Sequence, residues 1–171
     1  GVIDSKDRVV IGRWSAKFTG GMNLTLKYKN FTLFAMLTGQ FGGNAIKNDT
    51  YNWVYGERKY SDVVLGAWTE NKYKNGESIT YPRLTTQSGD NNFNTSDYWM
   101  YSTDRIDLSR VQLTYDFSKS LFGDNALVKG LQVYVNGSSL LTIAGERKQM
   151  ERNVGSAPQT RSFTIGAKVE F

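Results

Sequence analysis

The sequence has 171 residues and a net charge of +5, and 13% of its residues are aromatic. It contains neither His nor Cys, which excludes the commonest general base and metal ligand as well as disulfides and thiol catalysis. No apolar run reaches the length of a transmembrane helix, and the Lys and Arg residues are too dispersed to form a surface for nucleic acid.

The beginning of the chain resembles the closing half of a calcium-binding loop, with Gly1, Ile3, Asp4 and Asp7 at the matching positions. Only two carboxylates are present, however, and a calcium ion takes about six to eight oxygen ligands. We therefore expect a solvated acidic turn and no cofactor. Whether Asp4 and Asp7 complete a cation site with preceding residues is left open.

Two neighbouring segments alternate between apolar and polar side chains. The first runs from Phe18 to Tyr28 and the second from Phe31 to Phe41. A tight turn is predicted at Lys29-Asn30, because Asn tolerates a positive φ. Strands of about ten residues cross a bilayer at a tilt, whereas strands of soluble sheets usually have about five or six residues. Their length therefore favours membrane-spanning strands.

Residues 42–103 show no sustained period and are rich in Asn, Gly, Ser, Thr, Tyr and Trp. Such a long irregular connection is uncommon in a compact soluble domain but typical of the outer side of a membrane barrel. We predict a long extracellular loop. Packing of its aromatic side chains against one another is the alternative to ligand contact for each of them. The candidate ligand-binding residues of the loop are Trp53, Tyr55, Trp68, Tyr73, Tyr81, Arg83 and Trp99.

Three further strands are predicted after this loop. Residues 105–117 change phase midway, with Ile106 and Leu108 before the change and Val111 after it, as a β-bulge requires. Residues 131–141 then alternate again.

The last segment, residues 160–171, alternates up to a final aromatic residue. A strand whose face meets lipid has a reason to end in this way, whereas the last residues of a soluble domain usually fray. We interpret it as the C-terminal barrel-assembly strand, with one apolar face formed by Phe163, Ile165, Val169 and Phe171.

The predicted fold is all-β, with five antiparallel strands. Five strands cannot close a bacterial barrel, which needs at least about eight, and unpaired strand edges in lipid are too costly to persist. We therefore expect the chain to be part of a larger barrel.

The chain resembles the C-terminal end of SusC/RagA-family TonB-dependent outer-membrane transporters of Bacteroidetes. The resemblance covers nearly all 171 residues in the right order. Its motifs are the ID..DR..IG pattern at 3–12, the strand and turn at 18–31, FGGN at 41–44, YPR at 81–83, SDYW at 96–99, and the strands at 105–115, 131–142 and 161–171. The chain departs from the family at Ala16 in place of Pro, at Asp107 in place of Arg, and at Ser139 in place of Asn.

The resemblance implies that residues 1–171 belong to a barrel of about 22 strands whose plug and remaining strands lie outside this sequence. It implies an outer-membrane protein with extracellular loops and a periplasmic C-terminus. It further implies coupling to TonB through a missing N-terminal part, a SusD/RagB-like lipoprotein as partner, and oligosaccharide or oligopeptide cargo.

Two other classes of function fit parts of the sequence. A soluble β-sandwich carbohydrate-binding module or adhesin would use the same aromatic residues, but the strand length and the terminal Phe argue against it. An enzyme lacks nucleophile–base pairs in this composition, and Asp104 and Asp107 would point to opposite faces of a strand. We therefore predict a transport subunit and not an enzyme.

Overall fold

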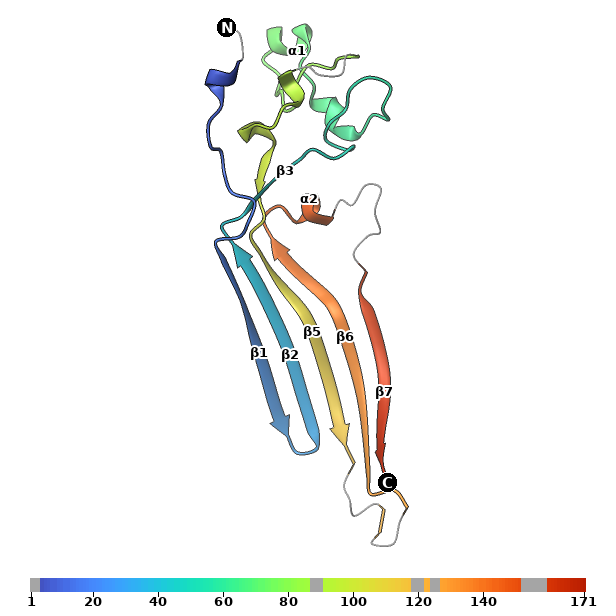
Figure 1. Ribbon diagram of the computed structural model, residues 1–171. Coiled ribbons are helices and arrows are strands. Elements are labelled where there is room, and N and C mark those ends of the chain that lie inside the picture. The colour runs from blue at the N-terminus through green and yellow to red at the C-terminus, as the bar shows by residue number, and fades with distance from the viewer. Residues whose placement is uncertain (1–3, 87–90, 118–121, 124–126, 152–159) are drawn as a thin grey trace.

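The computed structural model describes residues 4–86, 91–117, 122–123, 127–151 and 160–171. Its main element is an antiparallel sheet in which the strands follow the order β1-β2-β5-β6-β7 (Figure 1). These strands span Phe18–Tyr28 (β1), Phe31–Phe41 (β2), Arg105–Asp116 (β5), Gly130–Ala144 (β6) and Ser162–Glu170 (β7).

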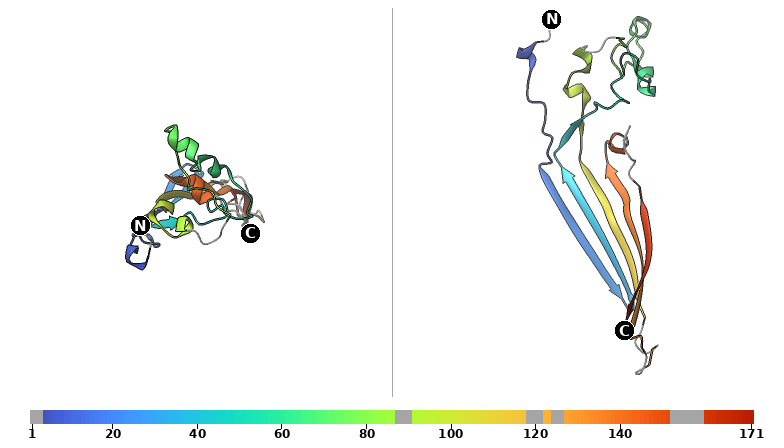
Figure 2. Two further views of the ribbon diagram at one scale, coloured as in Figure 1. Left: turned by 90° about the horizontal axis from the view of Figure 1, so that it is seen from above. Right: turned by 45° about the vertical axis from the view of Figure 1, so that its right-hand side comes forward.

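The remaining elements gather beyond one end of this sheet, and the C-terminus lies at the other end (Figure 1, Figure 2). None of the helices in the described residues is long and apolar enough to cross a membrane. The elements at this end are the paired strands β3 (Asn44–Ile46) and β4 (Met100–Ser102), the helices α1 (Glu70–Lys74) and α2 (Arg147–Glu151), and four 3-10 turns at Ser5–Asp7, Asp62–Gly66, Asn91–Phe93 and Asp97–Trp99.

The strand register places one apolar side chain from each strand in the same row across the sheet. Leu26 of β1 pairs with Leu33 of β2, which pairs with Leu113 of β5. The row continues through Val135 of β6 to Ile165 of β7. Because side chains alternate along each strand, such rows build one apolar face that carries no charged residue within the five described strands. The other large members of this apolar face are Phe18, Met22, Leu24, Tyr28, Phe31, Leu37, Phe41, Ile106, Leu108, Val111, Tyr115, Leu131, Val133, Leu141, Ile143, Phe163 and Val169.

The opposite face, called the polar face below, is laced with hydrogen bonds between side chains. Arg110 Nε donates to Asn136 Oδ1 at 2.8 Å, and its Nη2 donates to Gln112 Oε1 at 3.2 Å. Gln112 Nε2 in turn donates to Thr114 Oγ1 at 3.1 Å. A sheet with one charge-free apolar face and one hydrogen-bonded polar face is suited to separate lipid from a watery lumen.

Two β-bulges, one in β5 and one in β6, lie opposite each other and interrupt the regular pairing of the strands. Ser109 is an extra residue of β5 relative to β2, because the register shifts between Leu108 and Arg110. In β6, Ser139 and Leu140 together stand opposite Ser109, and Ser139 has a φ of 55°. The phase change predicted for residues 105–117 is therefore confirmed, whereas the matching bulge in β6 was not predicted.

The hairpin between β1 and β2 closes with two residues, because Tyr28 pairs with Phe31. The predicted turn is confirmed, but the reason given for it was wrong. The positive φ, 52°, belongs to Lys29 and not to Asn30. A positive φ at the first turn position alone is the pattern of a type II′ turn, where Gly is the usual residue.

The five predicted strands are all present, with β6 three residues longer at its end than expected. Residues 42–103, which show no period in the sequence, nevertheless contain β3, β4, α1 and three of the 3-10 turns. These short elements rest on side-chain packing and not on a repeated pattern, which is why the sequence did not indicate them.

Candidate functional site

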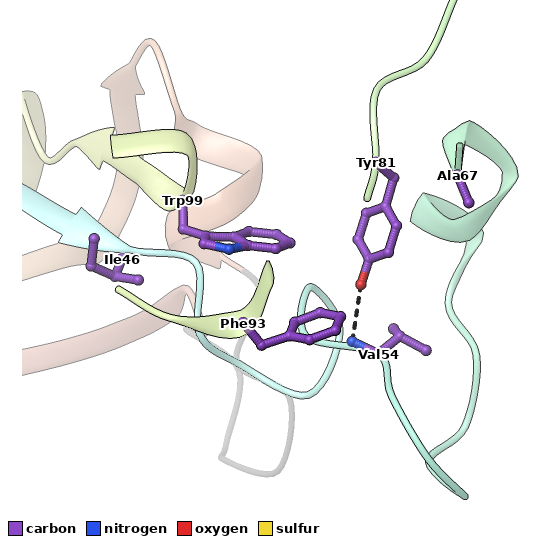
Figure 3. Packing of buried hydrophobic residues seen from close by; sticks show 6 residues of the cluster. All are labelled: Ile46, Val54, Ala67, Tyr81, Phe93 and Trp99. Carbon is purple, nitrogen blue, oxygen red and sulfur yellow. Dashed lines mark hydrogen bonds between the residues drawn. The ribbon is translucent and has the colours of Figure 1, made fainter. Parts of the chain in front are cut away.

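The long loop folds around a small core of its own, separate from the sheet (Figure 3). Its centre is Val54, which has no exposed surface, and Trp99, which is 3% exposed. Ile11, from the segment before β1, packs against this core. The other buried members are Ile46, Ala67, Tyr81 and Phe93.

Tyr81 is a buried member of this core, and its hydroxyl group makes two hydrogen bonds. Its hydroxyl donates to the carbonyl oxygen of Asn52 at 2.7 Å and accepts from the Val54 N–H at 3.0 Å (Figure 3). Burial raises the pKa of the Tyr81 hydroxyl, and the hydrogen bond from Val54 opposes this rise only in part. Tyr81 therefore fastens two parts of the loop to each other.

Trp99 and Trp53 belong to the same aromatic cluster. The Trp99 ring stacks on Phe93 with 6.0 Å between centroids and meets Trp53 edge-on at 6.1 Å. Trp99 Nε1 donates to the carbonyl oxygen of Asn92 at 2.8 Å. Buried Trp53 Nε1 has no hydrogen-bond partner within the described part of the chain. In the structure, Trp53, Tyr81 and Trp99 pack against other residues of the loop, which is the alternative to ligand contact.

The remaining candidate residues of the loop present more surface. Tyr73 on α1 is 70% exposed and Trp68 is 37% exposed. Arg83 is also exposed. The Tyr55 ring is flanked by Arg58, whose guanidinium carbon lies 4.2 Å from the ring centroid, and by Phe93 at 5.0 Å. Of the seven candidates, Trp68, Tyr73 and Arg83 are the most accessible to a ligand or a partner.

A polar cluster joins the long loop to the connection between β6 and β7. Asp49 Oδ2 accepts from Gln149 Nε2 at 2.8 Å, and Asn52 Nδ2 donates to Gln149 Oε1 at 3.1 Å. Asp49 Oδ1 also accepts from the N–H groups of Tyr51 and Asn52. Burial alone would raise the pKa of Asp49. The hydrogen bonds from the Asn52 side chain, together with those from the Asn52 N–H, the Gln149 side chain and the Tyr51 N–H, outweigh this effect and lower the pKa. Gln149 lies on α2, about a hundred residues away in sequence, so no local pattern predicted this link.

The acidic turn expected at the beginning of the chain is present at Asp4 and Asp7, whereas Gly1 and Ile3 lie outside the described residues. Asp4 Oδ1 accepts from the Lys6 N–H at 2.7 Å, and Asp7 Oδ2 accepts from the Asp4 N–H at 2.8 Å. The two carboxylates thus cap a short 3-10 turn. Across the described residues there is no group of three or more metal-ligating side chains of the His, Cys, Asp and Glu types.

The four residues of the predicted assembly strand share one side of β7 or follow it directly. Phe163, Ile165 and Val169 lie on the apolar face and are 71%, 82% and 42% exposed, and Phe171 follows the strand. β7 pairs only with β6 among the described strands, so its outer edge is open. The assembly role of this strand stays a prediction.

Comparisons with known proteins match the whole chain to one kind of protein. No protein-family profile matches it. Two curated relatives from Formosa agariphila, TonB-dependent receptor P3 and TonB-dependent receptor P39, are 22% and 24% identical to it over 100% and 98% of the chain. The chain spans less than a fifth of their length, namely 18% and 17%. A chain of the RagAB peptide importer in its open-open state superposes with a TM-score of 0.68 and 26% identity, over 90% of this chain and 17% of that one.

The sheet is therefore an antiparallel segment of a β-barrel wall, as the sequence predicted, and it is open because only part of the barrel is present. In sequence and in fold the chain is a relative of TonB-dependent receptors of the SusC/RagA type.

Proposed function

We propose that this chain forms part of an outer-membrane TonB-dependent transporter that imports oligopeptides or glycans together with a SusD-like surface lipoprotein. The observation that carries the proposal is the division of the five-stranded sheet into a charge-free apolar face and a hydrogen-bonded polar face. The apolar face would contact lipid, and the polar face would line the lumen. The kinship with TonB-dependent receptors and with a peptide importer supports the same function.

Aromatic side chains at one end of the apolar face support a membrane boundary there. The Phe31 and Tyr115 rings lie 4.7 Å apart, and Phe117 meets Tyr115 edge-on at 4.9 Å. Tyr28, next to the hairpin turn, is 71% exposed. Aromatic girdles of this kind mark the interfaces of membrane barrels. The two-residue turn between β1 and β2 at this end and the long loop at the other end fit a periplasmic side and an extracellular side, respectively.

The long loop would form part of the extracellular mouth. Its buried aromatic core would hold the loop in shape, and the exposed residues Trp68, Tyr73 and Arg83 would meet cargo or the lipoprotein lid. Aromatic rings with one apolar and one polar end are suited to such surfaces. Peptide cargo has the stronger support, because the matched structure is described as a peptide importer.

Membrane fractionation of cells that make the full-length protein tests the location. We expect a species of roughly 1,000 residues, given that the chain spans 18% of its relative, extracted from the outer membrane only by detergent. A folded, detergent-independent soluble species would contradict the transporter and favour the soluble carbohydrate-binding module.

Growth of a strain lacking the full-length gene tests transport. We expect loss of growth on an oligopeptide or an oligosaccharide as sole nutrient, restored by the intact gene. The matched control is a gene with its TonB-coupling segment deleted, which should reach the membrane but restore no growth. Normal growth of the deletion strain on every tested nutrient of both classes would contradict the proposal.

A further inference from the structure

A recess lies on the polar face at the end of the sheet that adjoins the loop core. One part of it, of about 430 Å³, is lined by β1, β2 and β5, and includes Thr38, Gln40, Arg105 and Asp107. A second part, of about 340 Å³, shares Arg105 and Asp107 with the first and extends over β6 to Thr142. Arg105 and Asp107 therefore line both parts of the recess.

Arg105 is held in place by its neighbour on the same face. Its Nε lies 3.0 Å from Asp107 Oδ2, and Asp107 Oδ1 accepts from Thr142 Oγ1 at 2.6 Å. Both oxygens of the carboxylate are thus engaged, and the carboxylate orients the guanidinium through Nε alone. Within the described part of the chain no partner contacts the two Nη groups of Arg105, whose side chain is 37% exposed. A guanidinium fixed in this way presents a two-pronged donor to the recess.

The bulges shape this recess. The extra residue Ser109 lies in the recess lining, and its Oγ is 2.8 Å from Thr38 Oγ1. Opposite it, Ser139 keeps a φ of 55°, a conformation that costs a non-glycine residue free energy. Bulges and strained backbone recur next to binding sites, where they redirect side chains. Here they add the hydroxyl groups of Ser109 and Ser139 to the lining of the part of the recess that also includes Arg105.

We propose that this recess binds a carboxylate group of the cargo through the two Nη groups of Arg105, an inference that rests on the proposed transport function. Asp107 acts as a positioning residue, and the hydroxyl groups of Thr38 and Ser109 supply further hydrogen bonds to the ligand. A peptide C-terminus and a uronic acid both carry the required group.

The test measures binding of defined carboxylates to the purified full-length transporter in detergent by titration calorimetry. The probes are acetyl-trialanine and its C-terminal amide, and trigalacturonate and the neutral galactose trisaccharide. The variant Arg105→Lys keeps the charge but removes the fork. The matched control is Arg110→Lys, because Arg110 lies on the same face of the same strand with its donors engaged by Asn136 and Gln112. Heat-modifiable mobility on a gel checks that each variant is folded.

We expect at least one carboxylate probe to bind about tenfold or more tightly than its neutral counterpart, in line with a charge-assisted bidentate contact. This preference should disappear in Arg105→Lys and persist in Arg110→Lys. Binding of acetyl-trialanine would assign a peptide source, and binding of trigalacturonate an acidic glycan. Equal binding of acid and neutral probes, an equal effect of the two variants, or no binding of either carboxylate would overturn the inference. The growth test above is read separately, so the proposed function can stand when this inference fails.

Discussion

The ring of Tyr134 covers Gly166 on the polar face, where β6 and β7 pair. A Cβ atom added to Gly166 would lie 2.8 Å from Tyr134 Cε1 and closer still to Cζ and Oη. Real Cβ atoms do not approach so closely, so the absence of a side chain at Gly166 is what admits the ring. The pair fastens the edge strand β7 to its neighbour.

Gly166→Ala is therefore expected to destabilise the full-length barrel by about 1–3 kcal/mol, the usual cost of overpacking. The measurement is the temperature at which heat-modifiable gel mobility is lost in detergent. The control is Gly20→Ala, because no heavy atom lies within 4 Å of a Cβ built at Gly20. Adding Tyr134→Ala to Gly166→Ala should remove most of the penalty. Equal melting of the Gly166 and Gly20 variants would contradict this account.

A second prediction concerns the effect of the bulge in β6 on the stability of the barrel. Ser139 has a φ of 55°, which Gly adopts freely and Asn tolerates better than Ser. Ser139→Gly is expected to stabilise the barrel by up to about 1 kcal/mol. Ser138→Gly, at a regularly paired neighbouring position, should instead destabilise it by roughly 0.5–1 kcal/mol. Thermal melting of both variants decides the sign, and a loss of stability in Ser139→Gly would show that the serine hydroxyl matters more than the strain.

The sequence predicted the sheet well because alternation is a local property. Every predicted strand is present, and the bulge at Ser109 left a visible change of phase. The bulge at Ser139 left no visible change of phase in the sequence, because serine also occurs in regularly paired strands. The resemblance did mark position 139 as usually Asn, and the positive φ supplies a physical reason for that preference.

The candidate site was harder to predict, because it depends on contacts between distant residues. Aromatic composition alone could not distinguish the buried Trp99 from the exposed Tyr73. The contact of Asp49 with Gln149 crosses about a hundred residues, and the setting of Arg105 requires the register of three strands. Such sites become visible only when the strands are paired.

Trp99 and Tyr73 are expected to respond in opposite ways to truncation. Trp99→Ala removes a 3% exposed ring from the loop core and should destabilise the loop by about 3–5 kcal/mol. Tyr73→Ala removes a 70% exposed ring and should leave loop stability within about 0.5 kcal/mol. Limited proteolysis of the loop measures stability, and binding of the purified lipoprotein lid measures function. Weaker lid or cargo binding in Tyr73→Ala alone would support the exposed aromatic surface, whereas unchanged binding would remove Tyr73 from it.

Acid is expected to release the long loop from α2. The hydrogen bonds to Asp49 lower its pKa below 3.8 in the folded protein, so their stabilising effect is fully present above 3.8. It is lost as the pH falls through the lowered pKa, because the protonated carboxyl no longer accepts these bonds equally well. Amide hydrogen exchange of residues 47–54, compared with β2 in the same sample, measures the effect.

Asp49→Asn should reproduce the acid effect at neutral pH. We expect about fivefold faster exchange in residues 47–54, for a loss of about 1 kcal/mol at a half-exposed carboxylate. The control is Asp97→Asn, because within the described part of the chain the Asp97 carboxylate accepts only the Tyr98 N–H. Unchanged exchange in Asp49→Asn would show that the aromatic core alone holds the loop.

The apolar face makes the prediction that bears most directly on the membrane. Leu24 and Thr25 are neighbours on β1, yet they point to opposite faces of the sheet. Leu24 belongs to the row with Ala35, Val111 and Phe163, in the middle of the apolar face. Leu24→Lys should therefore cost about 2–4 kcal/mol if that face meets the hydrocarbon core of a bilayer. Thr25→Lys adds the same charge to the polar face and should cost about 1 kcal/mol or less. Folding efficiency of the full-length barrel into lipid vesicles compares the two variants. If the two lysines were tolerated equally, the apolar face would have to be covered by protein and not by lipid.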